Sequence, residues 1–178
     1  MQWISSTKLL DEKIQGAYKM MSNSKKLDAM DKKLISYLSE DGRMPVKELV
    51  KKLQITSPTL QVRIKNLLQS GILKIAGVVD IFKTKKLFMA FIAIRVIDDL
   101  KIDQTLVDLS RMPEVTSVCV VTGRYDILAE VIFANDMEAH YNFMSSTLPA
   151  QGNIDYSESF VVMKSKKKWM ILPKDIEF

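Results

Sequence analysis

Residues 46–71 read VKELVKKLQITSPTLQVRIKNLLQSG and contain two apolar stripes with helical spacing. Between the stripes lies Gln54-Ile55-Thr56, a turn after which Thr56 can cap the second helix, while Gly71 ends it. Two helices joined by about three residues have the geometry of a helix-turn-helix, which presents its second helix to a partner. The stripes consist of Val46, Leu49, Val50 and Leu53, followed by Leu60, Ile64, Leu67 and Leu68.

The flanking sequence predicts the rest of a small domain. A third helical stripe begins after Asp28, a candidate N-cap, and stops at Gly42. Residues 72–79 read ILKIAGVV, which predicts two short strands around a turn. Three helices and a hairpin form a winged helix-turn-helix, expected here over residues 25–79, with a generic three-helix bundle as the alternative. The upstream stripe consists of Leu27, Met30, Leu34, Ile35 and Leu38.

The second helix of the pair has no acidic residue between Thr56 and Gly71. A helix that exposes arginine, lysine, glutamine and asparagine without a carboxylate suits the phosphates and base edges of double-stranded DNA. We expect Arg63 and Lys65 on phosphates and Gln61 as a base reader, with pairing of Arg63 to an acid of its own domain as the alternative. Thr59 is a second candidate reader, and Ser57 lies at a helix N-terminus that suits a phosphate. The candidate DNA-binding set is Arg43, Thr56, Ser57, Thr59, Gln61, Arg63 and Lys65.

Charge divides the chain into two blocks. Residues 1–86 hold 17 Lys and Arg against 8 Asp and Glu, a net charge of +9, whereas residues 87–178 hold 9 against 13, a net charge of −4. A basic first block favours nucleic acid as its partner, and an acidic second block suggests a module with another role. Charge alone leaves open the plainer interpretation that lysine-rich faces are solvated surface.

The second block alternates strand-like and helix-like segments. Strands are expected at 87–97, 115–122, 126–133 and 154–163, and helices at about 102–109 and 136–147. The order βαββαβ predicts a ferredoxin-like domain over residues 87–163, so the fold class is α+β. The remaining segments are an N-terminal extension with a weak amphipathic helix (1–24), a linker (80–86) and an exposed basic tail (164–178).

The chain resembles the Lrp/AsnC (feast/famine) family of transcription regulators from residue 27 to about 163. The most specific piece is Thr122-Gly123-Arg124-Tyr125-Asp126, which is similar to the family's Gly-x-Tyr/Phe-Asp loop. The chain departs from the family in a linker without Pro or Gly and in the segments outside the shared range, such as Trp169 to Phe178. The other matching pieces are Leu27-Asp28, Asp31, Asp41-Gly42-Arg43, Leu49, Leu53, Ile55-Thr56, Arg63-Ile64-Lys65, Leu67, Gly71-Ile72, Tyr156 and Val161-Val162-Met163.

The resemblance implies a sequence-specific DNA-binding transcription regulator that forms homodimers, and often tetramers or octamers, through its second domain. It also implies a possible amino-acid effector, held by Thr122, Gly123, Tyr125 and Asp126. Glycine lets a ligand approach backbone N–H groups closely, and Asp126 can pair with an ammonium group. A hairpin turn that only needs glycine, with Asp126 capping local amides, is the alternative. Independently, an open four-stranded sheet favours a partner sheet on its apolar face.

Residue counts argue against several other functions. The single cysteine, Cys119, is expected to pack in the sheet, and with the single histidine, His140, it leaves no Cys-based zinc site and little for acid–base catalysis. We therefore expect no metal, no cofactor and no enzymatic activity. The longest apolar run is shorter than the roughly 18 residues of a membrane helix, so a cytoplasmic, nucleoid-associated protein without a membrane partner is expected. An architectural, chromatin-like DNA-binding protein without an effector is the alternative function.

Overall fold

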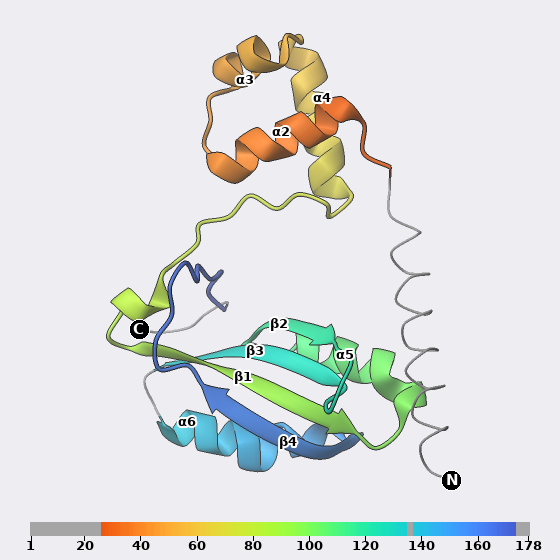
Figure 1. The fold of residues 1–178 in the computed structure, drawn as a ribbon, viewed down its shortest axis with the longest axis vertical. Coiled ribbons are helices and arrows are strands. Elements are labelled where there is room, and N and C mark those ends of the chain that lie inside the picture. Colours follow the sequence, from red (N-terminus) through yellow and green to blue (C-terminus); the bar gives the residue numbers. More distant parts are fainter. Residues whose placement is uncertain (1–25, 135–136, 174–178) are drawn as a thin grey trace. The chain divides into compact units, whose positions relative to one another are not determined.

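The computed structural model describes residues 26–134 and 137–173, and its contacts fall into two units that separate between Gly77 and Val78. Figure 1 shows the elements of both units. The amphipathic helix expected within residues 1–24 lies outside the described residues.

The N-terminal unit consists of helices α2 (Ala29–Glu40), α3 (Val46–Leu53) and α4 (Ser57–Gln69). Gln54 adopts a left-handed backbone conformation with a φ of 54°, which ends α3 and starts the turn into α4. The helix-turn-helix that the sequence predicts is thereby confirmed.

Caps and leucines stabilise these helices. The Asp28 carboxylate accepts a hydrogen bond from the backbone N–H of Asp31 at 2.7 Å, and the Thr56 hydroxyl accepts one from the N–H of Thr59. Each cap contributes about 1 kcal/mol. Each fully buried leucine contributes about 1.5–3 kcal/mol relative to an exposed one, so the leucine core dominates. Its buried members are Leu34, Leu38, Leu49, Leu53, Leu60 and Leu67.

The hairpin expected at residues 72–79 is absent: no strand forms within this segment. Leu73 packs partly against the leucine core, and its backbone N–H donates to the carbonyl of Leu67 at 3.2 Å. Val79 belongs to the C-terminal unit, where it forms an isolated antiparallel bridge with Met170. The hairpin prediction is wrong because the β-branched residues that suggested it are divided between two units.

The C-terminal unit confirms the predicted βαββαβ order. Its elements are β1 (Leu87–Val96), α5 (Ile102–Ser110), β2 (Val115–Val120), β3 (Ile127–Ala134), α6 (Met137–Asn142) and β4 (Ile154–Val161). The strands form an antiparallel sheet of order β2-β3-β1-β4, which places β1 between β3 and β4. Helix α6 is shorter than expected, because the chain continues as a π-helical turn at Phe143–Thr147.

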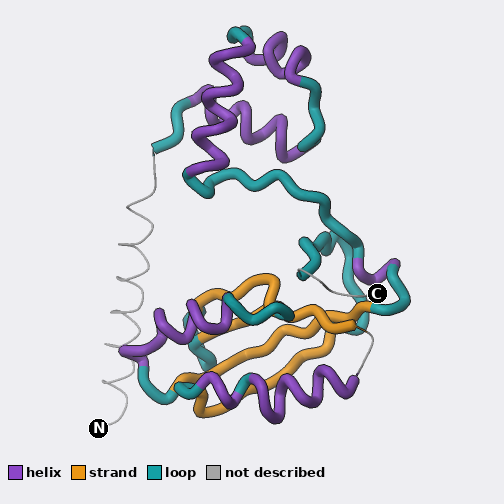
Figure 2. Tube along the Cα trace, turned by 180° about the vertical axis from the view of Figure 1, so that it is seen from behind, coloured by secondary structure: helices purple, strands orange, loops and turns teal. Residues whose placement is uncertain are grey.

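The two sides of the sheet have different surroundings, because alternate side chains of a strand face opposite sides. Ile92 and Ile94 of β1 pack with Leu109 and Phe143 in a buried core. Figures 1 and 2 show α5 and α6 along this side of the sheet. We call the other side the open face; its residues include Phe91, Ala93, Ser117, Cys119, Leu128, Glu130, Ile132, Tyr156, Glu158 and Phe160.

Part of the C-terminal tail packs against this unit instead of lying exposed. Met170 is only 4% exposed and is buried in one cluster with Met89 and Ile132. The Lys168 ammonium pairs with the Glu130 carboxylate at 2.5 Å. The expectation of an exposed tail is therefore wrong for this segment, because its partners are distant in the sequence and leave no local pattern.

Two further residues differ from expectation. Ile81, in the segment expected to be a linker, is fully buried in the same cluster as Met170. Cys119 is exposed rather than packed, because β2 is an edge strand and the Cys119 side chain lies on the open face.

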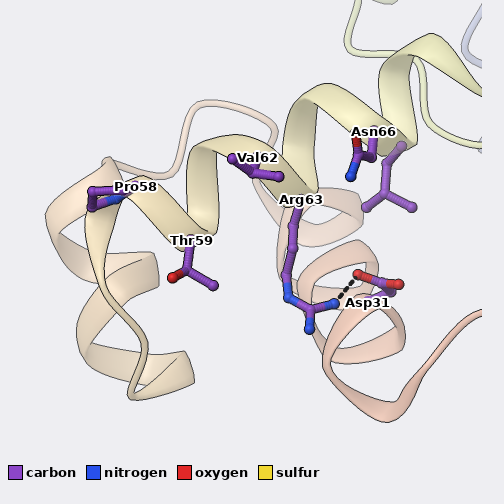
Figure 3. A pocket seen from close by; sticks show the side chains of 7 residues that line it. Asp31, Pro58, Thr59, Val62, Arg63 and Asn66 are labelled. Carbon is purple, nitrogen blue, oxygen red and sulfur yellow. Dashed lines mark hydrogen bonds and ion pairs between the residues drawn. The ribbon is translucent and has the colours of Figure 1, made fainter.

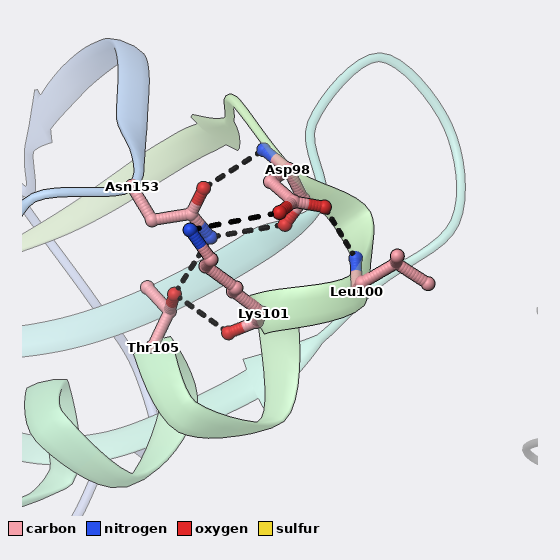
Figure 4. A network of polar contacts seen from close by, with 5 residues as sticks. All are labelled: Asp98, Leu100, Lys101, Thr105 and Asn153. Carbon is pink, nitrogen blue, oxygen red and sulfur yellow. Dashed lines mark hydrogen bonds and ion pairs between the residues drawn. The ribbon is translucent and has the colours of Figure 1, made fainter.

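A polar network fixes the turn between β1 and α5 (Figure 4). The Asn153 side chain accepts a hydrogen bond from the backbone N–H of Asp98 at 2.8 Å and donates to the carbonyl of Asp98 at 3.0 Å. It also donates to the hydroxyl of Thr105, which is 5% exposed. The network satisfies the polar groups of a half-buried turn and anchors the start of β4 to α5.

Replacing Met170 with alanine tests the packed tail. Met170→Ala is expected to lower the free energy of unfolding by about 2–5 kcal/mol, because it removes a buried side chain and leaves a cavity. Urea unfolding followed by circular dichroism measures the change. Met163→Ala is the matched control, since Met163 is 88% exposed, and its midpoint is expected to stay unchanged. Equal midpoints for both variants would contradict burial of the tail.

Candidate nucleic-acid interface

Helix α4 presents an acid-free surface on a basic unit. Residues 26–77 hold 10 Lys and Arg against 5 Asp and Glu. Leu60 and Leu67 of α4 are buried, whereas most of the residues that the sequence predicts as DNA contacts are exposed on α4, at its N-cap or, for Arg43, in the turn between α2 and α3. The exposed members of that predicted set are Arg43, Thr56, Ser57, Thr59, Gln61 and Lys65.

A groove with a volume of about 570 Å³ runs along α4. It is lined by Thr59 and Arg63 from the predicted set, and by Asp31 of α2 (Figure 3). It also includes Val62 and Asn66. The sequence does not mark Val62 as a candidate contact, because an apolar side chain has neither a charge nor a hydrogen-bonding group.

Arg63 is the predicted DNA contact whose surroundings differ most from expectation. Its guanidinium pairs with the Asp28 carboxylate at 2.8 Å and with the Asp31 carboxylate at 2.6 Å. Figure 3 shows the side chain reaching from α4 to Asp31 on α2. The arrangement follows from the alternative that the sequence left open, since two carboxylates three residues apart lie on one helix face and suit the fork of a guanidinium.

These contacts shift the acid–base equilibria of the pair. The backbone N–H of Asp31 and the Arg63 guanidinium donate hydrogen bonds to Asp28 and lower the pKa of its carboxyl. The hydrogen bonds to Asp28 and Asp31 raise the pKa of Arg63. Asp28 and Arg63 are therefore both charged at neutral pH, and the bridge ties α4 to the start of α2.

The Gly123 loop is held by hydrogen bonds within the C-terminal unit. The Asp126 carboxylate accepts a hydrogen bond from the backbone N–H of Val96 at 3.0 Å, and the N–H of Asp126 donates to the carbonyl of Ile94 at 2.9 Å. Gly123 has a φ of 121°, a conformation that L-residues with a Cβ rarely adopt. Glycine is therefore required here for the backbone alone.

The other polar groups of the loop have different surroundings. The Tyr125 hydroxyl donates to the Glu158 carboxylate on β4, and this hydrogen bond raises the pKa of Tyr125. The Tyr125 ring also stacks on Tyr156, with 6.5 Å between the ring centroids. Thr122 and Gly123 are exposed at the tip of the loop. The structure thus brings the four predicted effector residues into one loop, with Tyr125 and Asp126 bonded to β4 and β1.

Family comparisons cover both units. Residues 27–74 match a winged helix-turn-helix DNA-binding family, and residues 89–171 match the Lrp/AsnC ligand binding domain. The second match extends beyond residue 163, the end of the resemblance seen in the sequence, and includes the buried Met170.

Individual relatives agree with these two family matches. An uncharacterized HTH-type transcriptional regulator of Pyrococcus abyssi is 30% identical over 149 residues, which are 83% of this chain and 92% of the relative. The HTH-type transcriptional regulator FL11 of Pyrococcus furiosus is 31% identical, over 83% of this chain and 96% of its own. A transcriptional regulator of Neisseria meningitidis, solved in complex with L-Met, superposes with a TM-score of 0.65 at 26% identity, covering 84% of this chain and 98% of the other.

The fold and the exposed α4 define a DNA-binding transcription regulator of the helix-turn-helix type with a ferredoxin-like second unit. The chain belongs to the Lrp/AsnC family of such regulators.

Residues 26–134 and 137–173 contain neither a cluster of metal-binding side chains nor a helix that could cross a membrane. No group of three or more His, Cys, Asp or Glu side chains there is placed to hold a metal ion. Within the same residues, each helix is too short or too polar to cross a membrane.

The pKa shift of Asp28 predicts a contribution to acid sensitivity. The pKa of Asp28 is lower in the folded chain than its ordinary value of 3.8, so the ionised carboxylate stabilises the fold above about pH 3.8. This stabilisation is lost as the pH falls through the lower folded-state value. Asp28→Asn keeps a side-chain oxygen for the cap but removes the charge, and we expect its urea midpoint to fall less than that of the wild type between about pH 5 and 2.5.

The control for this experiment is Glu40→Gln, which removes an exposed acid from the other end of α2. This variant is expected to keep the acid dependence of the wild type. If Asp28→Asn and the wild type lose stability in parallel, the charge of Asp28 makes no contribution to the fold.

Proposed function

We propose that this regulator binds specific operator sequences by inserting α4 into the major groove. The supporting observation is the exposed, acid-free surface of α4 on a unit that matches a DNA-binding family. An α-helix fits the major groove, where each base pair presents a distinct pattern of donors, acceptors and methyl groups.

The proposed contacts divide by chemistry. Lys65 and Arg43 are exposed cations that bind phosphates, and Ser57 joins the N-terminus of the 13-residue helix α4 as a second phosphate site. Gln61 and Thr59 face base edges. Arg63 remains bonded to α2 and positions α4, instead of acting as a phosphate contact.

The second unit is proposed to join copies of the chain. The open face exposes aromatic side chains, including Phe160 at 48% and Tyr156 at 46%. A partner sheet would bury these rings, giving a homodimer that assembles further to a tetramer or octamer. A dimer with two-fold symmetry places two copies of α4 about one helical turn apart on DNA, so the operator is expected to be palindromic.

An amino acid is the proposed effector. The Neisseria meningitidis relative was solved in complex with L-Met, and the matched family domain is a ligand binding domain. The Thr122, Gly123, Tyr125 and Asp126 loop supplies exposed backbone, a hydroxyl and a carboxylate. Such an effector would act by binding two assembly or DNA-bound states with different affinities.

The proposed cellular setting is the cytoplasm, in association with the nucleoid. The relatives are transcriptional regulators and not enzymes, so turnover of the effector is not expected. An architectural DNA-binding protein without an effector is the second candidate, favoured by the basic charge of residues 26–77, which binds any duplex.

Selection from a random pool of DNA duplexes by the full chain distinguishes these functions. Enrichment of a palindromic sequence is expected, and repeating the selection with each amino acid should change the affinity in at least one case. Recovery of unenriched DNA, with affinity that depends only on salt, would support the architectural function instead.

Two variants separate phosphate contacts from base reading. Gln61→Ala is expected to weaken binding to the selected duplex by about 1–3 kcal/mol with little effect on random DNA. Lys65→Ala is expected to weaken binding to the selected duplex and to random DNA equally. It should also reduce the slope of log binding constant against log salt concentration by about one. Fluorescence anisotropy titrations measure both effects. Lys101→Ala removes a positive charge from the C-terminal unit and is the control for Lys65→Ala. If Gln61→Ala loses the same affinity for the selected duplex and for random DNA, Gln61 does not read a base.

An effector test follows from the exposed Thr122. The amino acid found in the selection is expected to raise the melting temperature of the wild type, since a ligand that binds the folded state stabilises it. Thr122→Val keeps the shape but loses the hydroxyl, so we expect a smaller shift with an unchanged melting temperature in the absence of ligand. Thr116→Val provides a hydroxyl-removal control outside the loop. If the ligand raises the melting temperature of wild type and Thr122→Val by the same amount, the effector binds elsewhere.

A further inference from the structure

Val62 is an exposed apolar residue in the middle of α4. It is 58% exposed, and the exposed residues nearest to it in the helix are polar or proline; the other exposed aliphatic residue of α4, Leu68, is 42% exposed and lies near its C-terminal end. A single exposed aliphatic residue is ordinary on a protein surface, so its exposure alone assigns no role. Its position on the helix decides what it can contact.

Val62 lies at the centre of the outward face. Each residue turns an α-helix by about 100°, so Val62 is roughly 160° from Leu60 and 140° from Leu67. Both of these leucines are buried, at 0% and 2% exposed. Gln61, the predicted base reader, lies about 100° to one side of Val62, which places it on the flank of this face.

The Arg63 bridge adds a directional restraint to the orientation that the buried leucines set. Arg63 directly follows Val62 and points toward α2, where the two carboxylates hold it at 2.8 Å and 2.6 Å. Figure 3 shows Val62 and Arg63 leaving neighbouring positions of α4 in different directions. Because the bridge restrains rotation of α4 about its axis, Val62 remains directed outward.

The neighbours of Val62 leave room for a base. Pro58 and Thr59 are short, and with Asn66 they line the groove that includes Val62. Helix α4 itself has no carboxylate, and Asp31, the carboxylate of α2 that lines this groove, is paired with Arg63. Val62 can therefore approach the floor of the major groove, although its own side chain is short.

In the major groove the C5 methyl of thymine is the one apolar group among base edges. Valine has no donor or acceptor, so against the other base edges it would cover polar atoms without hydrogen-bonding them. We propose that Val62 determines specificity by contacting the methyl group of one thymine in each half-site. This inference rests on the proposed insertion of α4 into DNA and adds the base that the helix centre reads.

The test removes only the methyl group. In the duplex chosen by random selection with the full chain, each thymine is replaced in turn by deoxyuridine. At one position per half-site we expect wild-type affinity to fall about three- to tenfold, because an apolar contact is lost. Val62→Ala is expected to bind the thymine duplex more weakly, by a similar factor, and to show no further loss at that deoxyuridine.

Two further variants serve as comparisons for Val62→Ala. Val62→Thr keeps the branched shape and one methyl but replaces the other methyl with a hydroxyl, so its discrimination between thymine and deoxyuridine is expected to lie between that of the wild type and that of Val62→Ala. Leu68→Ala removes another aliphatic side chain of α4 that is 42% exposed, about 120° from Val62, and it is expected to discriminate like the wild type.

The outcomes separate this inference from the proposed function. A selected sequence at which wild type and Val62→Ala respond equally to every deoxyuridine would overturn the role of Val62 and leave operator binding standing. Failure of the pool to yield any preferred sequence would overturn both. Loss of discrimination in Leu68→Ala as well would show a general effect on α4 and would also overturn the inference.

Discussion

The bridge from Arg63 to Asp28 and Asp31 determines what the N-terminal unit can present. Buried leucines hold the helices together, but apolar packing is non-directional and fixes the rotation of a helix only loosely. A guanidinium held by two carboxylates adds a directional restraint, because its planar fork accepts few geometries. Asp28 also caps α2, so the same residue starts one helix and orients another. The buried leucines therefore select the outward face of α4, and the bridge restrains the rotation of that face.

The C-terminal unit is organised by alternation along β1. Even-numbered residues such as Ile92 and Ile94 enter the core beneath α5 and α6, which leaves Phe91 and Ala93 on the open face. The chain covers part of that face with its own tail, through Met170 and Lys168. The uncovered part lies toward β4 and the Gly123 loop, where Tyr125, Tyr156 and Glu158 interact. Dimer formation and effector sensing are thus proposed for adjoining surfaces of one sheet.

Periodicity explains which features could be predicted from the sequence. The spacing of the leucines predicted the helix-turn-helix, and the runs of β-branched residues predicted the βαββαβ order. Both patterns lie within single elements, so they can be recognised in the sequence. Burial of Met170 and Ile81 could not be predicted, because their partners are remote in the chain. The partner of Arg63 was one of two open alternatives, since an arginine on an acid-free helix has the same local pattern whether it binds phosphate or a carboxylate. The exposure of Val62 could not be predicted, because an apolar residue in a helix has the same local sequence pattern whether it is buried or exposed.

The two predicted sites differ in how their polar groups are used, and this difference bears on function. On α4 the side chains that face outward, such as Gln61 and Lys65, are exposed, so DNA can be bound without breaking the fold. In the loop, Asp126 already accepts a hydrogen bond from Val96, and Tyr125 donates to Glu158. A ligand that uses those groups must share or replace contacts that fasten the loop to β1 and β4. The effector binding proposed for this loop would therefore be coupled to the sheet, which is what a regulator needs if a small molecule is to alter its assembly.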